Sequence, residues 1–181
     1  QFDNISVDHG MFLYNKTGIK IDTFNTDWTI ANSQINTAAA NAPGNGIHIV
    51  RAAGILIENT FGGGTAEGRN IGGTFLYIDS VGTLTLIGVS AERTQKTIYA
   101  VPSTSAASPM MTVIGGVFGS PIELNGRLNF ISIGNHYSAR TIQAGPGVTV
   151  TSNGDRFCYD PLTMPNTCLE PGSRTPVTKP G

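Results

Sequence analysis

The stretch ISIGNHYS (residues 131–138) contains the pattern that decides the fold of this chain. An apolar residue, a small polar residue and a second apolar residue precede a Gly–Asn pair. Related triplets recur 17 to 29 residues apart, and six of the seven have Ser or Thr in the middle. They occupy residues 5–7, 28–30, 55–57, 84–86, 111–113, 131–133 and 148–150. Such alternation is typical of a β-strand with one buried face.

A residue suited to a tight bend stands two positions after each triplet. Five of these seven residues are Asn or Gly, which tolerate the left-handed backbone conformation that a tight corner requires. The seven are His9, Asn32, Asn59, Gly88, Gly115, Asn135 and Ser152. Each triplet is therefore predicted to be a short strand that ends at a corner. Its middle residue is expected to point outward, giving a polar row of Ser6, Thr29, Thr85, Thr112, Ser132 and Thr149.

A second strand-like segment follows each of the first six triplets. These segments are residues 18–22, 46–50, 75–79, 97–101, 121–125 and 140–144. The connection to the next triplet is short in five of the six cases, whereas the other connection varies widely in length. Insertions that collect at one corner of a repeating unit are typical of a solenoid. The sequence therefore predicts an all-β chain folded as a parallel β-helix of about seven coils, with the segment 32–42 as a loop.

The C-terminal segment differs from the rest in composition. Half of the ten prolines lie between residues 160 and 181, so strand pairing is not expected there. We therefore divide the chain into a β-helix over residues 1–157 and an irregular Pro-rich tail over residues 158–181. Because the chain opens inside a strand pattern with no cap, we expect it to be the C-terminal part of a longer solenoid.

Cys158 and Cys168 are the only cysteines and lie at the start of this tail. Two cysteines this close, with no others to pair with, predict a disulfide that pins the tail to the last coil in an oxidising compartment. The alternative is a pair of free thiols in a protein made in a reducing cytosol.

The ladder of strands resembles the right-handed, single-stranded β-helix proteins of the pectate-lyase superfamily. Within that group the chain looks most like bacteriophage tailspikes and depolymerases and related secreted polysaccharide-active enzymes. The resemblance covers residues 2–157 and is carried by NGIHIV (45–50), LTLIGVSAE (84–92) and ISIGNHYS (131–138). It implies a right-handed solenoid, a polysaccharide ligand, a homotrimer, and a location outside the cell or on a virion surface.

One outward-facing column of the second strands groups polar and aromatic residues. If the neighbouring isoleucines and leucine point inward, Lys20, His48, Tyr77, Tyr99 and Glu123 point outward from successive coils. Aromatic rings pack on the apolar faces of sugars, and polar neighbours bind sugar hydroxyls. These residues are candidates for polysaccharide binding, and so is Arg93. Arg93 is expected to form a wall beside the column together with Glu67, Arg69 and Glu92 of the long variable corners. The alternatives are a contact with a neighbouring subunit and a plain strand surface.

The candidates for catalysis are Glu123, Glu92 and Asp79. Glycosidases place two carboxyl groups about 5 to 9.5 Å apart, and no pair in the sequence clearly meets this requirement. A lyase instead needs a base beside a positive charge, and Tyr99 with Arg93 is the candidate pair. No cofactor is indicated. The three histidines are too scattered to predict a metal site.

The composition argues against two classes of partner. The formal net charge is −1, which gives no electrostatic support for binding nucleic acid. No apolar run approaches the roughly 18 residues that cross a membrane. The resemblance, together with the outward column, implies a protein that binds and degrades polysaccharide as part of a phage tailspike or a secreted depolymerase. The alternative is a non-catalytic carbohydrate-binding or trimer-forming stalk, in which Leu56, Ile87 and Ile114 form an apolar contact face.

Overall fold

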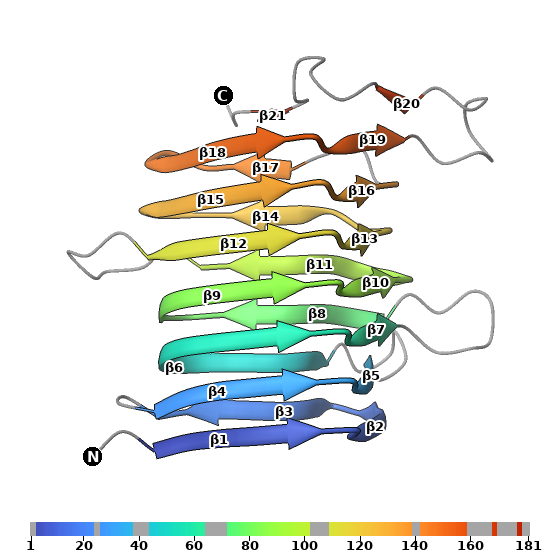
Figure 1. The fold of residues 1–181 in the computed structure, drawn as a ribbon, viewed down its shortest axis with the longest axis vertical. Coiled ribbons are helices and arrows are strands. Elements are labelled where there is room, and N and C mark those ends of the chain that lie inside the picture. The colour runs from blue at the N-terminus through green and yellow to red at the C-terminus, as the bar shows by residue number, and fades with distance from the viewer. Residues whose placement is uncertain are drawn as a thin grey trace.

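The computed structural model describes residues 3–23, 26–37, 44–63, 72–101, 109–138, 142–158, 168–169 and 177–178. Throughout these ranges the regular secondary structure is β-strand, with no helix (Figure 1). The strands form three series, which the chain visits in the same order again and again. With one exception in the tail, neighbouring strands within a series pair in parallel. The prediction of an all-β chain with parallel strands is confirmed, and the arrangement is compatible with a β-helix or a barrel.

The first series contains the longest strands. In order of pairing it comprises β1 (Asp3–Asp8), β4 (Thr26–Ala31), the C-terminal half of β6 (Asn45–Glu58), β9 (Val81–Ile87), β12 (Met110–Ile114), β15 (Leu128–Ile133) and β18 (Val148–Asn153). These strands correspond to the seven triplets of the sequence.

The second series consists of short strands that follow the tight corners. It comprises β2 (Met11–Asn15), β5 (Gln34–Thr37), β7 (Phe61–Gly63), β10 (Ser90–Glu92), β13 (Val117–Phe118), β16 (His136–Tyr137), β19 (Arg156–Cys158) and the antiparallel β20 (Cys168–Leu169). The prediction that residues 32–42 form a loop is wrong for Gln34–Thr37, and residues 38–42 lie outside the described ranges.

The third series carries the second strands of the sequence pattern. It comprises β3 (Thr17–Asp22), the N-terminal half of β6, β8 (Gly72–Ile78), β11 (Thr94–Ala100), β14 (Ile122–Leu124), β17 (Ile142–Ala144) and β21 (Val177–Thr178). Because β6 runs on from the third series into the first, these two series belong to one continuous sheet.

The inward-facing residues of the three series form one continuous apolar core. Ile and Leu dominate the inward rows of the first and third series. Aromatic rings occupy the inner row of the second series toward its C-terminal end, where the Tyr137 ring stacks on Phe118 and Phe157 with centroid distances of 5.4 and 5.0 Å. Burial of this apolar surface is the main favourable term in folding such a stack.

The tight corner after each first-series strand contains one residue with positive φ. These residues are His9, Asn32, Asn59, Gly88, Gly115, Gly134 and Gly154, with φ between 45° and 68°. The sequence prediction is confirmed for the first five corners. It is wrong for the last two, where Asn135 and Ser152 were expected at the bend. Glycine adopts this conformation without the steric cost that a Cβ brings.

The same two units were also placed in the wrong register. Thr112 pairs with Ile131 and Val113 pairs with Ser132, so the unit aligned with residues 111–113 is 130–132. Phe130 and Ser132 are fully buried, whereas Ile133 is 38% exposed. The expected outward Ser132 therefore points inward, because a shift of one residue reverses the faces of a strand. Its hydroxyl lies 2.6 Å from the Tyr137 hydroxyl, which satisfies the buried polar group. In the last unit, residues 150–152 align with residues 130–132, two positions later than predicted. A shift of two residues keeps each side chain on its face, and Thr149 is exposed as expected.

Strand pairing continues into the Pro-rich tail, contrary to expectation. Two short segments that contain no proline, β20 and β21, pair with β19 and β17. The antiparallel β19–β20 pair places Cys158 directly opposite Cys168. Directly opposed residues of an antiparallel pair have Cα atoms about 4.5 to 5.5 Å apart, within the range that a disulfide bridges. The register is therefore compatible with the disulfide, which stays a prediction.

Candidate functional site

The predicted outward column is assembled by the third series. Backbone register pairs Lys20 with His48, His48 with Tyr77, Tyr77 with Tyr99, and Tyr99 with Glu123. The two residues that flank each of these five are buried. The five side chains therefore share the outer face. Adjacent strands lie about 4.8 Å apart, which brings each side chain into contact range of the next.

The aromatic rings of this column pack on one another. The His48 ring meets the Tyr77 ring edge to face at a centroid distance of 5.0 Å, and the Tyr77 and Tyr99 centroids are 5.2 Å apart with a 45° tilt. The Lys96 ammonium lies 3.9 Å from the centroid of the Tyr99 ring. The two tyrosines are therefore half-buried, rather than fully exposed as the sequence suggested. The column does not offer a broad, flat stacking platform.

Two ion pairs border the tyrosines. His48 Nε2 lies 2.8 Å from Asp79 Oδ2, and Lys96 Nζ lies 2.6 Å from Glu123 Oε2. Both pairs are partly exposed, so each contributes little to stability, about 0–1 kcal/mol. Their effect is to hold an imidazole, an ammonium and two carboxylates in fixed positions around the rings.

The surroundings of Tyr77 shift its pKa. Desolvation raises its pKa above the usual value, and the negative charge of Asp79 and the neighbouring Tyr99 act in the same direction. The phenol is therefore neutral at ordinary pH. A neutral phenol both donates and accepts hydrogen bonds, which suits it to polar ligands.

Lys96 was not predicted from the sequence. Strict alternation from Tyr99 places Lys96 on the inner face, but Thr97 and Ile98 are both buried in succession. Thr97 tolerates this position because its hydroxyl donates to the Ser120 carbonyl oxygen at 2.9 Å. The double inward step returns Lys96 to the outer face, above Tyr99. Phe75 and Leu76 on β8 are likewise two consecutive inward residues. This neighbouring apolar pair is the sequence feature that could have placed Lys96 on the outer face.

The candidate catalytic residues are not brought together. Asp79 and Glu123 are two strands and two positions apart, which corresponds to about 12 Å between their backbones. Asp79 is also drawn toward His48, on the side of β8 away from β14. Glycosidases hold their two carboxyl groups about 5 to 9.5 Å apart. Here Asp79 contacts His48 and Glu123 contacts Lys96, so the two side chains do not turn toward each other across this backbone separation.

Glu92 and Arg93 lie away from the column. Both are exposed at the junction of β10 and β11, and Arg93 has a positive φ of 56°. Six residues of extended strand separate Arg93 from Tyr99, which is about 20 Å. The expected pairing of Tyr99 with Arg93 is therefore not formed. Glu67 and Arg69, which were expected on the same wall, lie outside the described residues.

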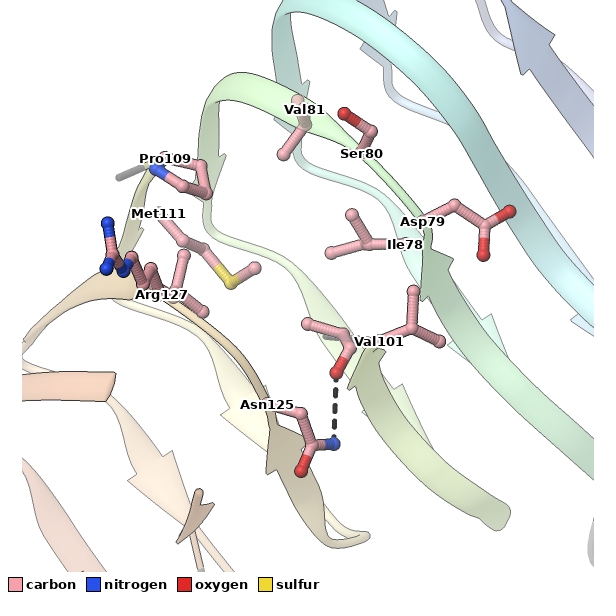
Figure 2. Close-up of a pocket in the computed structure, with 11 residues that line it drawn as sticks. Ile78, Asp79, Ser80, Val81, Val101, Pro109, Met111, Asn125 and Arg127 are labelled. Atoms are coloured by element: carbon pink, nitrogen blue, oxygen red, sulfur yellow. Dashed lines mark hydrogen bonds between the residues drawn. The ribbon is translucent and has the colours of Figure 1, made fainter. Parts of the chain in front are cut away.

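A hollow lies at the corner where the third series leads into the first (Figure 2). Its floor is apolar and includes Ile78, Val81 and Met111, and its rim carries Asp79 and Arg127. Asp79 therefore belongs both to the rim of this hollow and to the ion pair with His48. The hollow is small, because a water-sized sphere can place its centre in only about 20 Å³ of it.

The first series carries an exposed apolar strip on its outer face. Ile87, Ile114 and Ile133 are in register on β9, β12 and β15, and Ile87 and Ile133 are each more than one third exposed. Ile87 and Ile114 were predicted for this face, and Leu56 lies nearby on β6. Ile133 was missed because of the register error.

Two kinds of feature are absent from the described residues. These residues contain no group of three or more His, Cys, Asp or Glu side chains placed to hold a metal ion. Nor do they include a helix with the length and apolar character needed to span a membrane. Comparisons of the chain with protein-family models, with curated proteins and with solved structures gave no match.

Proposed function

We propose that this chain is a right-handed parallel β-helix of the pectate-lyase type whose third series binds a polysaccharide. The path of the chain supports this handedness. In Figure 1 the first series crosses the front from left to right, the third returns behind it, and the stack rises from the N-terminal end. Right-handed crossovers are also the rule for parallel strands.

The observation that carries the binding proposal is the column of His48, Tyr77, Tyr99 and Glu123 with its paired partners. Within about 15 Å it offers phenol, imidazole, ammonium and carboxylate groups, spaced by the strand separation of about 4.8 Å. Sugars present closely spaced hydroxyls that both donate and accept hydrogen bonds. A regular row of such protein groups suits a polymer that lies along the stack axis. Because Lys96 covers one face of Tyr99, hydrogen bonding contributes more to this mode of binding than ring stacking does.

A binding experiment tests the proposal. The protein is screened on an array of bacterial capsular and plant polysaccharides, and affinity for the best ligand is measured by titration calorimetry. Replacing Tyr77 and Tyr99 together by Ala should weaken binding by about 1–3 kcal/mol, because it removes two phenol hydroxyls that bond the sugar and the contact area of both rings. Phe61→Ala is the matched control, because Phe61 is an exposed aromatic residue of the second series. Equal affinities of the double variant and the wild type would refute the proposal.

Binding is better supported than cleavage for the described residues, because the side chains of Asp79 and Glu123 do not turn toward each other as a glycosidase pair would. We therefore expect no release of reducing ends from the bound polymer. A reducing-sugar assay on the same panel checks this. Release that is abolished by Glu123→Gln, with binding retained, would instead assign hydrolysis or elimination to the column.

The exposed apolar strip favours a second role as a subunit contact. Ile87, Ile114 and Ile133 form a continuous outward row, and such patches commonly mark interfaces. We propose that this face joins three copies into a parallel trimer and so forms a stalk. Analytical ultracentrifugation should detect a trimer that Ile114→Lys dissociates. A wild-type protein that stays monomeric at high concentration would exclude this role.

A further inference from the structure

The corner hollow next to the column has a local cause in the sequence. Ala100 pairs with Ile78 on one side and with Leu124 on the other, and all three face the interior. A small side chain between two large ones leaves space that the neighbouring strands do not fill completely. Ala100 lines the hollow, together with Met111. The hollow is therefore formed in part by this row, and Val101 and Pro109 complete its lining.

The hollow lies at the C-terminal ends of the strands that carry the candidate polysaccharide site. Asp79 and Asn125 stand two positions after Tyr77 and Glu123, and both line the hollow. Two residues of strand span about 7 Å. Asn125 is fixed there by donating from Nδ2 to the Ala100 carbonyl oxygen at 3.1 Å, as Figure 2 shows. A sugar bound on the column therefore places a substituent within reach of the hollow.

The chemistry of the hollow selects the kind of substituent. Ile78, Val81 and Met111 give a floor that accepts a methyl group but offers no hydrogen bond. Arg127 lies at the rim, is exposed, and has no ion-pair partner among the described residues. Its guanidinium can donate a hydrogen bond to a carbonyl oxygen. An acyl group matches both features, with its methyl on the floor and its carbonyl oxygen at Arg127.

We propose that this hollow is a subsite for the acetyl group of an acetylated sugar, carried on nitrogen or on oxygen. The inference rests on the proposed polysaccharide binding and adds the substrate class. Binding in the hollow requires no movement of the core, because the cavity is open in the unliganded chain.

Methionine methyl NMR reads occupancy of the hollow directly. The chain has four methionines, of which Met111 lines the hollow and Met110 is exposed on the outer face. The N-acetyl probe is chitotetraose, and its control is cellotetraose, which has hydroxyl groups in place of the acetamido groups. The O-acetyl probe is acetylated glucomannan oligosaccharide, with the same preparation after alkaline deacetylation as control. One acetylated probe should shift the Met111 signal, and its control should not.

Two variants separate the subsite from general binding. Ala100→Ile fills the hollow and should lower affinity for the acetylated probe at least tenfold, to the level of its control. Arg127→Gln leaves the core untouched and should lower the affinity for the acetylated probe about three- to tenfold. Arg93→Gln, an exposed arginine at the far end of β11, should change nothing.

The outcomes distinguish this inference from the broader proposal. Equal binding of acetylated and control probes, or an unmoved Met111 signal in the complex, would overturn the acetyl subsite and leave polysaccharide binding intact. Failure of every acetylated probe to bind would also overturn it. Loss of binding to the whole array would reject both. If Ala100→Ile fails to fold, the Arg127→Gln titration and the Met111 signal of the wild type still decide.

Discussion

Phe130 and Ile133 provide a stringent test of the strand register, because the two possible registers assign them opposite environments. The Phe130 side chain is fully buried in the core, and Ile133 is 38% exposed on the outer face. In the register first expected from the sequence, Ile131 and Ile133 would face inward and Phe130 outward. Single alanine substitutions at these two positions therefore give opposite results in the two cases.

The magnitudes follow from burial. Phe130→Ala removes a ring from a closed core and should lower the free energy of unfolding by about 3–5 kcal/mol. Ile133→Ala removes contacts on a partly exposed surface and should cost less than about 1 kcal/mol. The first change is a large fraction of the total stability of a domain, which is about 5–15 kcal/mol. Phe130→Leu should fall between the two.

Urea titration followed by circular dichroism measures both free energies of unfolding. Protein concentration is kept low and then varied, so that a subunit contact at Ile133 is recognised by its concentration dependence. A cost at Ile133 equal to or greater than that at Phe130, at all concentrations, would refute the register.

Three further predictions concern the tail, the corners and the buried tyrosine. Mass analysis after alkylation without reductant should find Cys158 and Cys168 blocked, and two labelled thiols would contradict the disulfide. Gly115→Ala should cost about 1–2 kcal/mol from backbone strain alone, because φ is 61° and a Cβ there meets no atom within 4 Å. An unchanged urea midpoint would count against that corner geometry. Tyr137→Phe should cost about 1 kcal/mol through loss of the contact with Ser132. Burial raises the pKa of Tyr137, so the folded state keeps its proton above about pH 10, where the unfolded state loses it. Stability should therefore fall as the pH rises past that point, and this part of the fall should be missing from Tyr137→Phe.

Alternation of apolar and polar residues was sufficient to predict most of the first and third series. Ile47, Leu76 and Ile98 are buried in long strands. A shift of such a strand by one residue would expose its whole row of apolar side chains, so only one facing is possible. The outward column of His48, Tyr77 and Tyr99 followed directly from that facing. The sequence therefore located the candidate site before its geometry was known.

The pattern could not fix the unit around Phe130. Both 130–132 and 131–133 combine apolar residues with a serine, so a search for triplets accepts either frame. The decision depends on contacts outside the strand, since the buried Ser132 hydroxyl is satisfied by Tyr137 and by Asn135. Pattern analysis of a single strand does not contain that information.

The second series and Lys96 were missed for related reasons. Strands such as Val117–Phe118 and His136–Tyr137 are too short to show a period. Lys96 lies beyond a break in alternation, and the break is stabilised by a hydrogen bond from Thr97 to Ser120, in the bend that precedes β14. Such features become visible when neighbouring strands are aligned with one another.

The most direct test of the central claim is an NMR titration of the tyrosine rings with the best-binding oligosaccharide from the array. The chain has five tyrosines, and ring-labelled protein reports on each of them. Polysaccharide binding along the third series predicts that the signals of Tyr77 and Tyr99 shift together with saturation, while that of the buried Tyr137 does not move. A saturable complex in which neither Tyr77 nor Tyr99 responds would contradict the claim.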